Sequence, residues 1–83
     1  MFLITRDELD NVVYQVEGHG FNKETATTKF RLFDDDGELC YSGILTDDDD
    51  AAAQTYALQW GAYDSGCTTI KVLRDGVWVQ DIG

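Results

Sequence analysis

Positive charge is scarce in this sequence: 6 Lys and Arg stand against 16 Asp and Glu, and the formal net charge is -10. Because phosphate backbones are bound by Lys and Arg, direct binding to DNA or RNA is disfavoured. No apolar run approaches the roughly 20 residues that span a bilayer. The segment 1–6 also lacks the basic start and long apolar stretch of a signal peptide. We therefore expect a cytoplasmic protein that does not contact membranes.

Cysteine and histidine are equally rare, with 2 Cys and a single His. Two cysteines close at most one bridge, and Cys40 and Cys67 lack the spacing of metal ligands, so we expect both to be reduced and half-buried. His19 lies between two glycines, as in a turn, and no orienting group for a Cys–His nucleophile pair is evident. Zinc, phosphate-loop and dinucleotide motifs are absent. We expect a protein that is not an enzyme and has no cofactor or metal.

Apolar residues make up 43% of the chain and aromatic residues 12%, too many for a disordered acidic tail. Runs of β-branched and aromatic residues, alternation, and the pairs Asp36-Gly37 and Asp75-Gly76 predict strands joined in part by hairpins. The expected strands are Phe2–Thr5, Val12–Val16, Thr27–Phe33, Leu39–Leu45, Thr68–Leu73 and Val77–Ile82.

A helix is expected between the fourth and fifth strands. Thr46 and Asp47 are N-cap candidates, and Thr46 with Asp49 resembles a capping box. Gly61 begins to weaken the helix and Gly66 ends it. The residues expected to face the sheet follow i, i+3, i+4, i+7 spacing and are Ala53, Tyr56, Ala57 and Trp60.

These elements predict an α+β fold formed by a single compact domain, residues 1–83. The expected architecture is a twisted antiparallel sheet, with element order β-β-β-β-α-β-β and one helix packed on one face.

Negative charge is concentrated in the middle of the chain. Between Arg31 and Lys71 there is no base, and the nine acids there are Asp34, Asp35, Asp36, Glu38, Asp47, Asp48, Asp49, Asp50 and Asp64. Most of them form two clusters, 34–38 and 47–50, one at each end of the fourth strand. A seven-residue strand separates such clusters by roughly 20–25 Å. On one face, they could occupy phosphate-binding positions on a basic groove.

The acidic clusters also have simpler interpretations. Asp34, Asp35 and Asp36 can make a turn, and Asp47–Asp50 can cap a helix, although each needs only one or two aspartates. Acidity can also serve general solvation, as in a halophile. Calcium binding is a weaker alternative, because the consecutive acids of 34–38 lack the alternate spacing of an EF-hand loop.

The last hairpin carries apolar residues on both faces. A two-residue turn at Asp75-Gly76 pairs Val72 with Val79 and Leu73 with Trp78. One face then holds Ile70, Val72, Val77 and Val79, and the other holds Leu73, Trp78 and Ile82. Only one face can lie under the helix. Trp78 therefore belongs either to a second small core closed by the N-terminal strand or to a partner-binding or dimer surface, and Tyr14, Phe33 and Tyr41 raise the same question.

A short acidic chain with one sheet and an Ala-rich helix that reaches Trp60-Gly61 resembles the small phage-encoded inhibitors of the anti-CRISPR and DNA-mimic type. The resemblance covers size, charge and layout, and rests on no motif. It implies an inhibitor in the host cytoplasm that occupies the basic nucleic-acid-binding surface of a protein such as a CRISPR effector. The expected contacts are Asp34, Asp35, Asp36, Glu38, Asp47, Asp48, Asp49, Asp50 and Trp78. The alternative is a structural or assembly module, such as a homodimer, that self-associates through the C-terminal hairpin.

Overall fold

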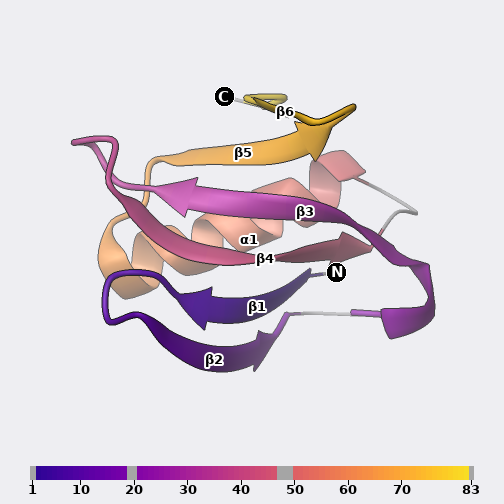
Figure 1. Cartoon of the computed structure of the whole chain (residues 1–83), viewed down its shortest axis with the longest axis horizontal. Coiled ribbons are helices and arrows are strands. Elements are labelled where there is room, and N and C mark those ends of the chain that lie inside the picture. The colour runs from indigo at the N-terminus through magenta and orange to yellow at the C-terminus, as the bar shows by residue number, and fades with distance from the viewer. Residues whose placement is uncertain (1, 19–20, 47–49, 83) are drawn as a thin grey trace.

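The fold is an antiparallel sheet with one helix behind it (Figure 1). A computed structural model describes residues 2–18, 21–46 and 50–82. Its elements are β1 (Phe2–Asp7), β2 (Val12–Glu17), the 3-10 helix η1 (Lys23–Thr25), β3 (Ala26–Phe33), β4 (Leu39–Thr46), α1 (Asp50–Ser65), β5 (Thr69–Arg74) and β6 (Val77–Val79).

The six strands pair in the order β2-β1-β4-β3-β5-β6, and every pairing is antiparallel. Helix α1 follows β4 and crosses the back of the sheet in Figure 1, so the strand face toward the viewer carries no helix. This confirms the predicted α+β class and element order. Among the described residues no helix is long and apolar enough to cross a membrane.

The C-terminal hairpin has the predicted register, with Val72 opposite Val79 and Leu73 opposite Trp78. Asp75 and Gly76 both have positive φ, 50° and 80°, which is the geometry of a tight type I′ turn. Strand β6, however, ends at Val79. Alternation stops there, so Ile82 packs against the main core, and its predicted place beside Trp78 is wrong.

The ends of α1 only partly match the prediction. Thr46 is the last residue of β4, and its hydroxyl accepts a hydrogen bond from the Asn22 backbone N–H (3.3 Å), so it is not the N-cap. The capping partner Asp49 and the candidate Asp47 lie outside the described residues. Gly66 ends the helix as predicted, with a φ of 71° and its N–H bonded to the Ala62 carbonyl.

A stripe of small residues lies against the sheet. Ala53, Ala57 and Gly61 are buried at i, i+4, i+8 spacing. Helix α1 continues past Gly61 to Ser65, and a Cβ at Gly61 would lie 2.8 Å from the Leu32 side chain. Tyr56 was predicted to face the sheet, but it is 44% exposed, because the buried stripe runs along positions four apart.

Aromatic rings fill the core beside this stripe. Trp60 is half-buried and contacts three rings, with centroids 4.8 Å from Tyr41, 6.4 Å from Phe2 and 6.4 Å from Tyr14. Phe2 meets the fully buried Phe30 edge-to-face at 6.5 Å. These contacts place Tyr14 and Tyr41 on the helix side of the sheet. The aromatic content thus compensates for the small core of a short chain.

The absence of a side chain at Gly43 leaves room for the Phe30 ring and for the close approach of β1 to β4. It lies in β4 opposite Phe30, and a Cβ there would lie 2.1 Å from the Leu3 carbonyl oxygen and 2.7 Å from the Phe30 ring. The backbone atom cannot move away without distorting the β1–β4 pairing.

We expect Gly43→Ala to lower the free energy of unfolding by about 1–3 kcal/mol, the usual cost of overpacking. Urea denaturation followed by Trp fluorescence measures the change. Gln15→Ala, at an exposed position of β2, is the control and should lie within about 0.5 kcal/mol of wild type. Equal stabilities for both variants would contradict the close contact.

Cys40 and Cys67 contact each other under the helix end. Both are buried, deeper than the half-buried positions predicted, and the Cys40 thiol donates to the Glu38 carbonyl (3.5 Å). They are not disulfide-bonded in this structure. Burial raises the pKa of both thiols, that of Cys67 to about 12. Since the thiolate is the reactive form, both are poor nucleophiles at neutral pH.

The native protein should therefore react slowly with a thiol reagent such as dithiobis-nitrobenzoate at pH 8, and the same protein in guanidinium should release two equivalents at once. The ratio of the two rates reports the protection by burial. Rapid labelling of native protein would contradict the buried, protonated thiols.

Candidate acidic interface

Three separate segments bring carboxylates to one end of the molecule, the left end in Figure 1: the β1–β2 turn, the β3–β4 hairpin and the end of α1. The Glu8 N–H donates to the Cys40 carbonyl (2.9 Å), which ties the first segment to the start of β4. The Tyr41 hydroxyl donates to the Asp64 carboxylate, which ties β4 to the helix end. We call this region the acidic end; its carboxylates are Asp7, Glu8, Asp10, Asp34, Asp35, Asp36, Glu38 and Asp64.

Some of these carboxylates build the turns. The Asp34 carboxylate accepts hydrogen bonds from the backbone N–H groups of Asp36 and Glu38, both at 2.9 Å. Asp7 does the same for Leu9 (3.0 Å) and Asp10 (3.1 Å). Turn formation therefore explains Asp34 and Asp7, as aspartates commonly bond the backbone of their own turn.

Glu8 neutralises the base of this end. Its carboxylate pairs with the Arg6 guanidinium at 3.1 Å and also accepts a hydrogen bond from the Ser42 hydroxyl. Arg6 further donates to the Asn11 side chain. Its positive charge is thus engaged and does not compensate the other acids.

The remaining carboxylates of the hairpins have no internal function. Asp10, Asp35, Asp36 and Glu38 are exposed, and their side chains make no hydrogen bond or ion pair within residues 2–18, 21–46 and 50–82. Neither turn geometry nor capping requires them. They are the groups of this end that are available to a partner.

Asp64 lies at the C-terminal end of α1, whose last turn holds no basic residue. A negative charge is unfavourable there, because the helix dipole places partial negative charge at the same end. The Tyr41 hydroxyl offsets part of this cost by donating a hydrogen bond to the Asp64 carboxylate. The same hydroxyl also lies in hydrogen-bond contact with the Ser65 hydroxyl at 2.9 Å. Burial first, and then the Asp64 carboxylate, raise the pKa of the Tyr41 phenol to about 12.

The two predicted clusters fall at opposite ends of β4. Asp34, Asp35, Asp36 and Glu38 belong to the acidic end. Asp47, Asp48 and Asp49 lie outside the described residues, and Asp50 is the first residue of α1. Asp7, Glu8 and Asp10 were missed, and Asp64 was counted among the nine acids but not expected at this site, because only the pairing of β1 with β4 and the path of α1 bring them here.

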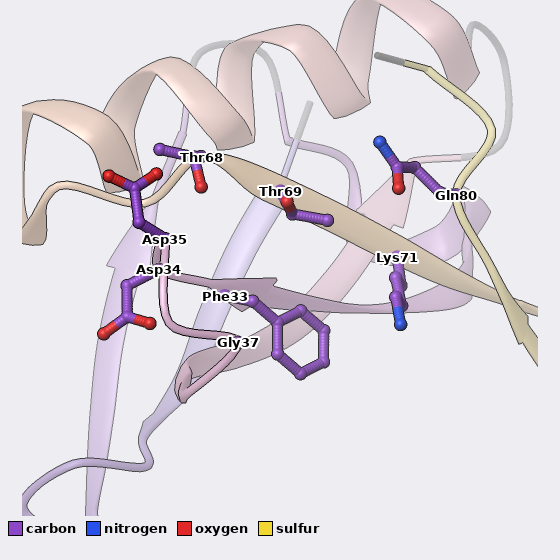
Figure 2. A pocket seen from close by; sticks show the side chains of 8 residues that line it. All are labelled: Phe33, Asp34, Asp35, Gly37, Thr68, Thr69, Lys71 and Gln80. Atoms are coloured by element: carbon purple, nitrogen blue, oxygen red, sulfur yellow. The ribbon is translucent and has the colours of Figure 1, made fainter.

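Trp78 lies on the face of the sheet that carries no helix. The Arg31 guanidinium covers its ring, 4.1 Å from the centroid, and Lys71 lies 5.2 Å from the Phe33 ring. A hollow of about 320 Å³ lies beside Lys71 (Figure 2). Its two aspartates, Asp34 and Asp35, lie at one end of the view and Lys71 at the other. Opposite charges therefore border one surface.

The two cysteines are not activated as nucleophiles. Both thiols are buried with raised pKa values, and His19 lies outside the described residues. In the described part of the chain no group of three His, Cys, Asp or Glu side chains is arranged to hold a metal ion. The acidic end can present its exposed carboxylates to a cationic surface.

Comparison with protein-family models, with curated proteins and with solved structures finds no match to this chain.

An alkaline titration followed at 295 nm should show one phenol that ionises near pH 12 and is lost in Tyr41→Phe. Because the pKa of Tyr41 in the folded state lies above the ordinary value of 10.0, the stability it contributes is complete below pH 10 and declines as the pH rises toward 12. Thermal midpoints between pH 8 and 11 in wild type and Tyr41→Phe measure this decline. Parallel curves for the two proteins would contradict the assigned environment.

Proposed function

We propose that this chain is a small non-catalytic binding protein whose acidic end occupies a basic, nucleic-acid-binding surface of a partner protein. The observation that carries the proposal is the convergence of three chain segments on one end, where the exposed carboxylates of Asp10, Asp35, Asp36 and Glu38 have no partner among the described residues. Such an end offers several negative charges at once, as a nucleic-acid backbone does.

The cost of the arrangement supports a function in binding. Like charges held close together destabilise the folded state through repulsion. At this end the single described base, Arg6, is already paired with Glu8, and Asp64 lies at the unfavourable end of the helix dipole. General solvation would be served as well by acids spread over the whole surface.

The chemistry of a suitable partner follows from the carboxylates. Arg and Lys side chains that normally hold phosphates would pair with Asp35, Asp36 and Glu38, and electrostatic attraction would speed the encounter. The partner is then unable to hold its nucleic acid, so inhibition by competition is the expected effect. This agrees with the resemblance to anti-CRISPR and DNA-mimic inhibitors.

The test compares two variants with equal charge. Asp35→Asn/Asp36→Asn/Glu38→Gln neutralises the hairpin but keeps the Asp34 turn bonds. Glu17→Gln/Glu24→Gln/Asp75→Asn removes the same three charges at exposed positions elsewhere. Both change the formal net charge from -10 to -7. We expect the first variant to lose affinity for the partner by roughly tenfold or more and the second to lose little.

The partner is first captured from a nuclease-treated extract of the source organism or its host, on immobilised wild type, and identified by mass spectrometry. The purified partner is then mixed with labelled DNA or RNA and titrated with each protein. Displacement by wild type and by the control variant, but not by the hairpin variant, supports the proposal. Equal displacement by all three proteins, or none by wild type, would contradict it.

The same variants separate binding from solvation. Because removing crowded like charges relieves repulsion, the hairpin variant should be at least as stable as wild type in urea. A variant that is stable but no longer displaces the nucleic acid identifies the lost charges as binding groups. A variant that is less soluble but displaces normally would identify them as solvating groups.

A further inference from the structure

The helix-free face of the sheet carries several large apolar side chains, although nothing in the described structure covers it. Leu3 and Ile44 are register partners on this face, as are Leu73 and Trp78, and all four side chains are half-buried. Ile44, Leu73 and Trp78 line a shared hollow of about 320 Å³. A sheet with apolar side chains on both faces is typical of a structure with a further packed layer.

Unpaired positive charge lies on the same face. Lys29 and Arg31 follow each other along β3, and Arg31 is the direct register partner of Lys71. Like charges directly opposite each other on neighbouring strands are destabilising. Among the described residues none of these cations makes an ion pair, although the chain has 16 acids. The face is therefore suited to a negatively charged occupant.

Single-stranded nucleic acid is a poor fit for this occupant. Bases bind open sheets by stacking on free aromatic rings, but Arg31 lies over the Trp78 ring and Lys71 over the Phe33 ring. The chain's formal charge of -10 also repels a phosphate backbone. A protein surface with carboxylates and apolar side chains meets both requirements of the face.

The molecule itself carries that surface. Along β3 and into its hairpin the charge changes sign, from Lys29 and Arg31 to Asp34 and Asp35. Asp34 and Asp35 border the same hollow as Phe33 and Lys71, so the acids adjoin the cationic face (Figure 2). A two-fold axis across β3 would lay the cations of one copy over the acids of the other, twice in each dimer.

We propose that the helix-free face packs against the same face of a second copy, with the β3 strands antiparallel and the hairpin aspartates of each copy over the cations of the other. The arrangement is closed and self-complementary, as two-fold dimers are. The molecule measures 31 × 23 Å in the view of Figure 1, an outline of at most about 700 Å², so this dimer is expected at the small end of specific interfaces, which bury roughly 800 Å² per partner.

The inference goes beyond the proposed function and does not depend on it, because a monomer can present the same acidic end. Self-association and displacement of nucleic acid from a partner are measured separately.

Sedimentation velocity of the wild-type chain over a wide concentration range tests the dimer. We expect a monomer–dimer equilibrium that Lys29→Glu and Asp35→Lys each weaken by roughly tenfold or more, because each substitution acts twice. Both residues are exposed, and the Asp35 side chain makes no described contact, so both variants should fold. Circular dichroism and thermal unfolding check this, and Lys71→Glu replaces Lys29→Glu if that variant fails to fold.

The decisive measurement mixes the Lys29→Glu and Asp35→Lys variants. The glutamate introduced in one copy then faces the lysine introduced in the other, and the unchanged cations face the unchanged acids. The mixture should therefore form a heterodimer although each variant alone is monomeric. Thr55→Glu/Gln59→Glu on α1 is the charge control: like Lys29→Glu, it changes the formal net charge from -10 to -12. This control should dimerise almost as well as wild type.

Three results would overturn the inference. They are a wild type that is monomeric at every concentration, a dimer that persists in both single variants, and a mixture that stays monomeric while each variant alone has lost the dimer. The second result would point instead to another surface, such as the edge strand β2, where Val12 and Val13 are exposed.

Discussion

The arrangement depends on how closely α1 approaches the sheet. Ala53, Ala57 and Gly61 form a buried stripe, and at Gly61 even a methyl group would meet Leu32 and Cys67. This short distance lets a single helix cover the apolar residues of the central strands. It also sets the direction of the helix, so that its last turn ends beside Tyr41, where Asp64 joins the carboxylates of both hairpins. The close packing of this stripe against the sheet thus determines both which face of the sheet the helix covers and where the acidic end lies.

The sequence was sufficient for the local elements and insufficient for their assembly. Asp75-Gly76 correctly predicted a tight turn, and the register of Leu73 with Trp78 followed from it. Those signals lie within one hairpin. Tyr56 has helical spacing with Ala53, but a large side chain does not fit where the helix backbone lies close to the strands, and this distance cannot be predicted from periodicity.

Non-local pairing explains what sequence reasoning missed at the surface. Asp7 and Asp10 belong to a part of the chain whose charge is nearly balanced, and only the β1–β4 pairing carries them to the acidic hairpin. In the same way, Arg31 and Lys71 bound a segment without bases in the sequence, yet β3 and β5 pair and place them side by side. The fold therefore brings eight of the 16 acids to one end and places Lys29, Arg31 and Lys71 together on the helix-free face.

Neighbouring acids of the β3–β4 hairpin differ in what they do: one stabilises the turn and others are exposed at the surface. This difference has a consequence for how the protein can evolve. Asp34 holds the turn through two backbone hydrogen bonds, while the side chains of Asp35 and Asp36 make no hydrogen bond or ion pair within the described chain. Substitutions at the free positions change the surface at little cost in stability, whereas Asp34 is constrained. A lineage can thus adjust its binding surface one residue at a time, as fast as a partner changes, on a scaffold that stays the same.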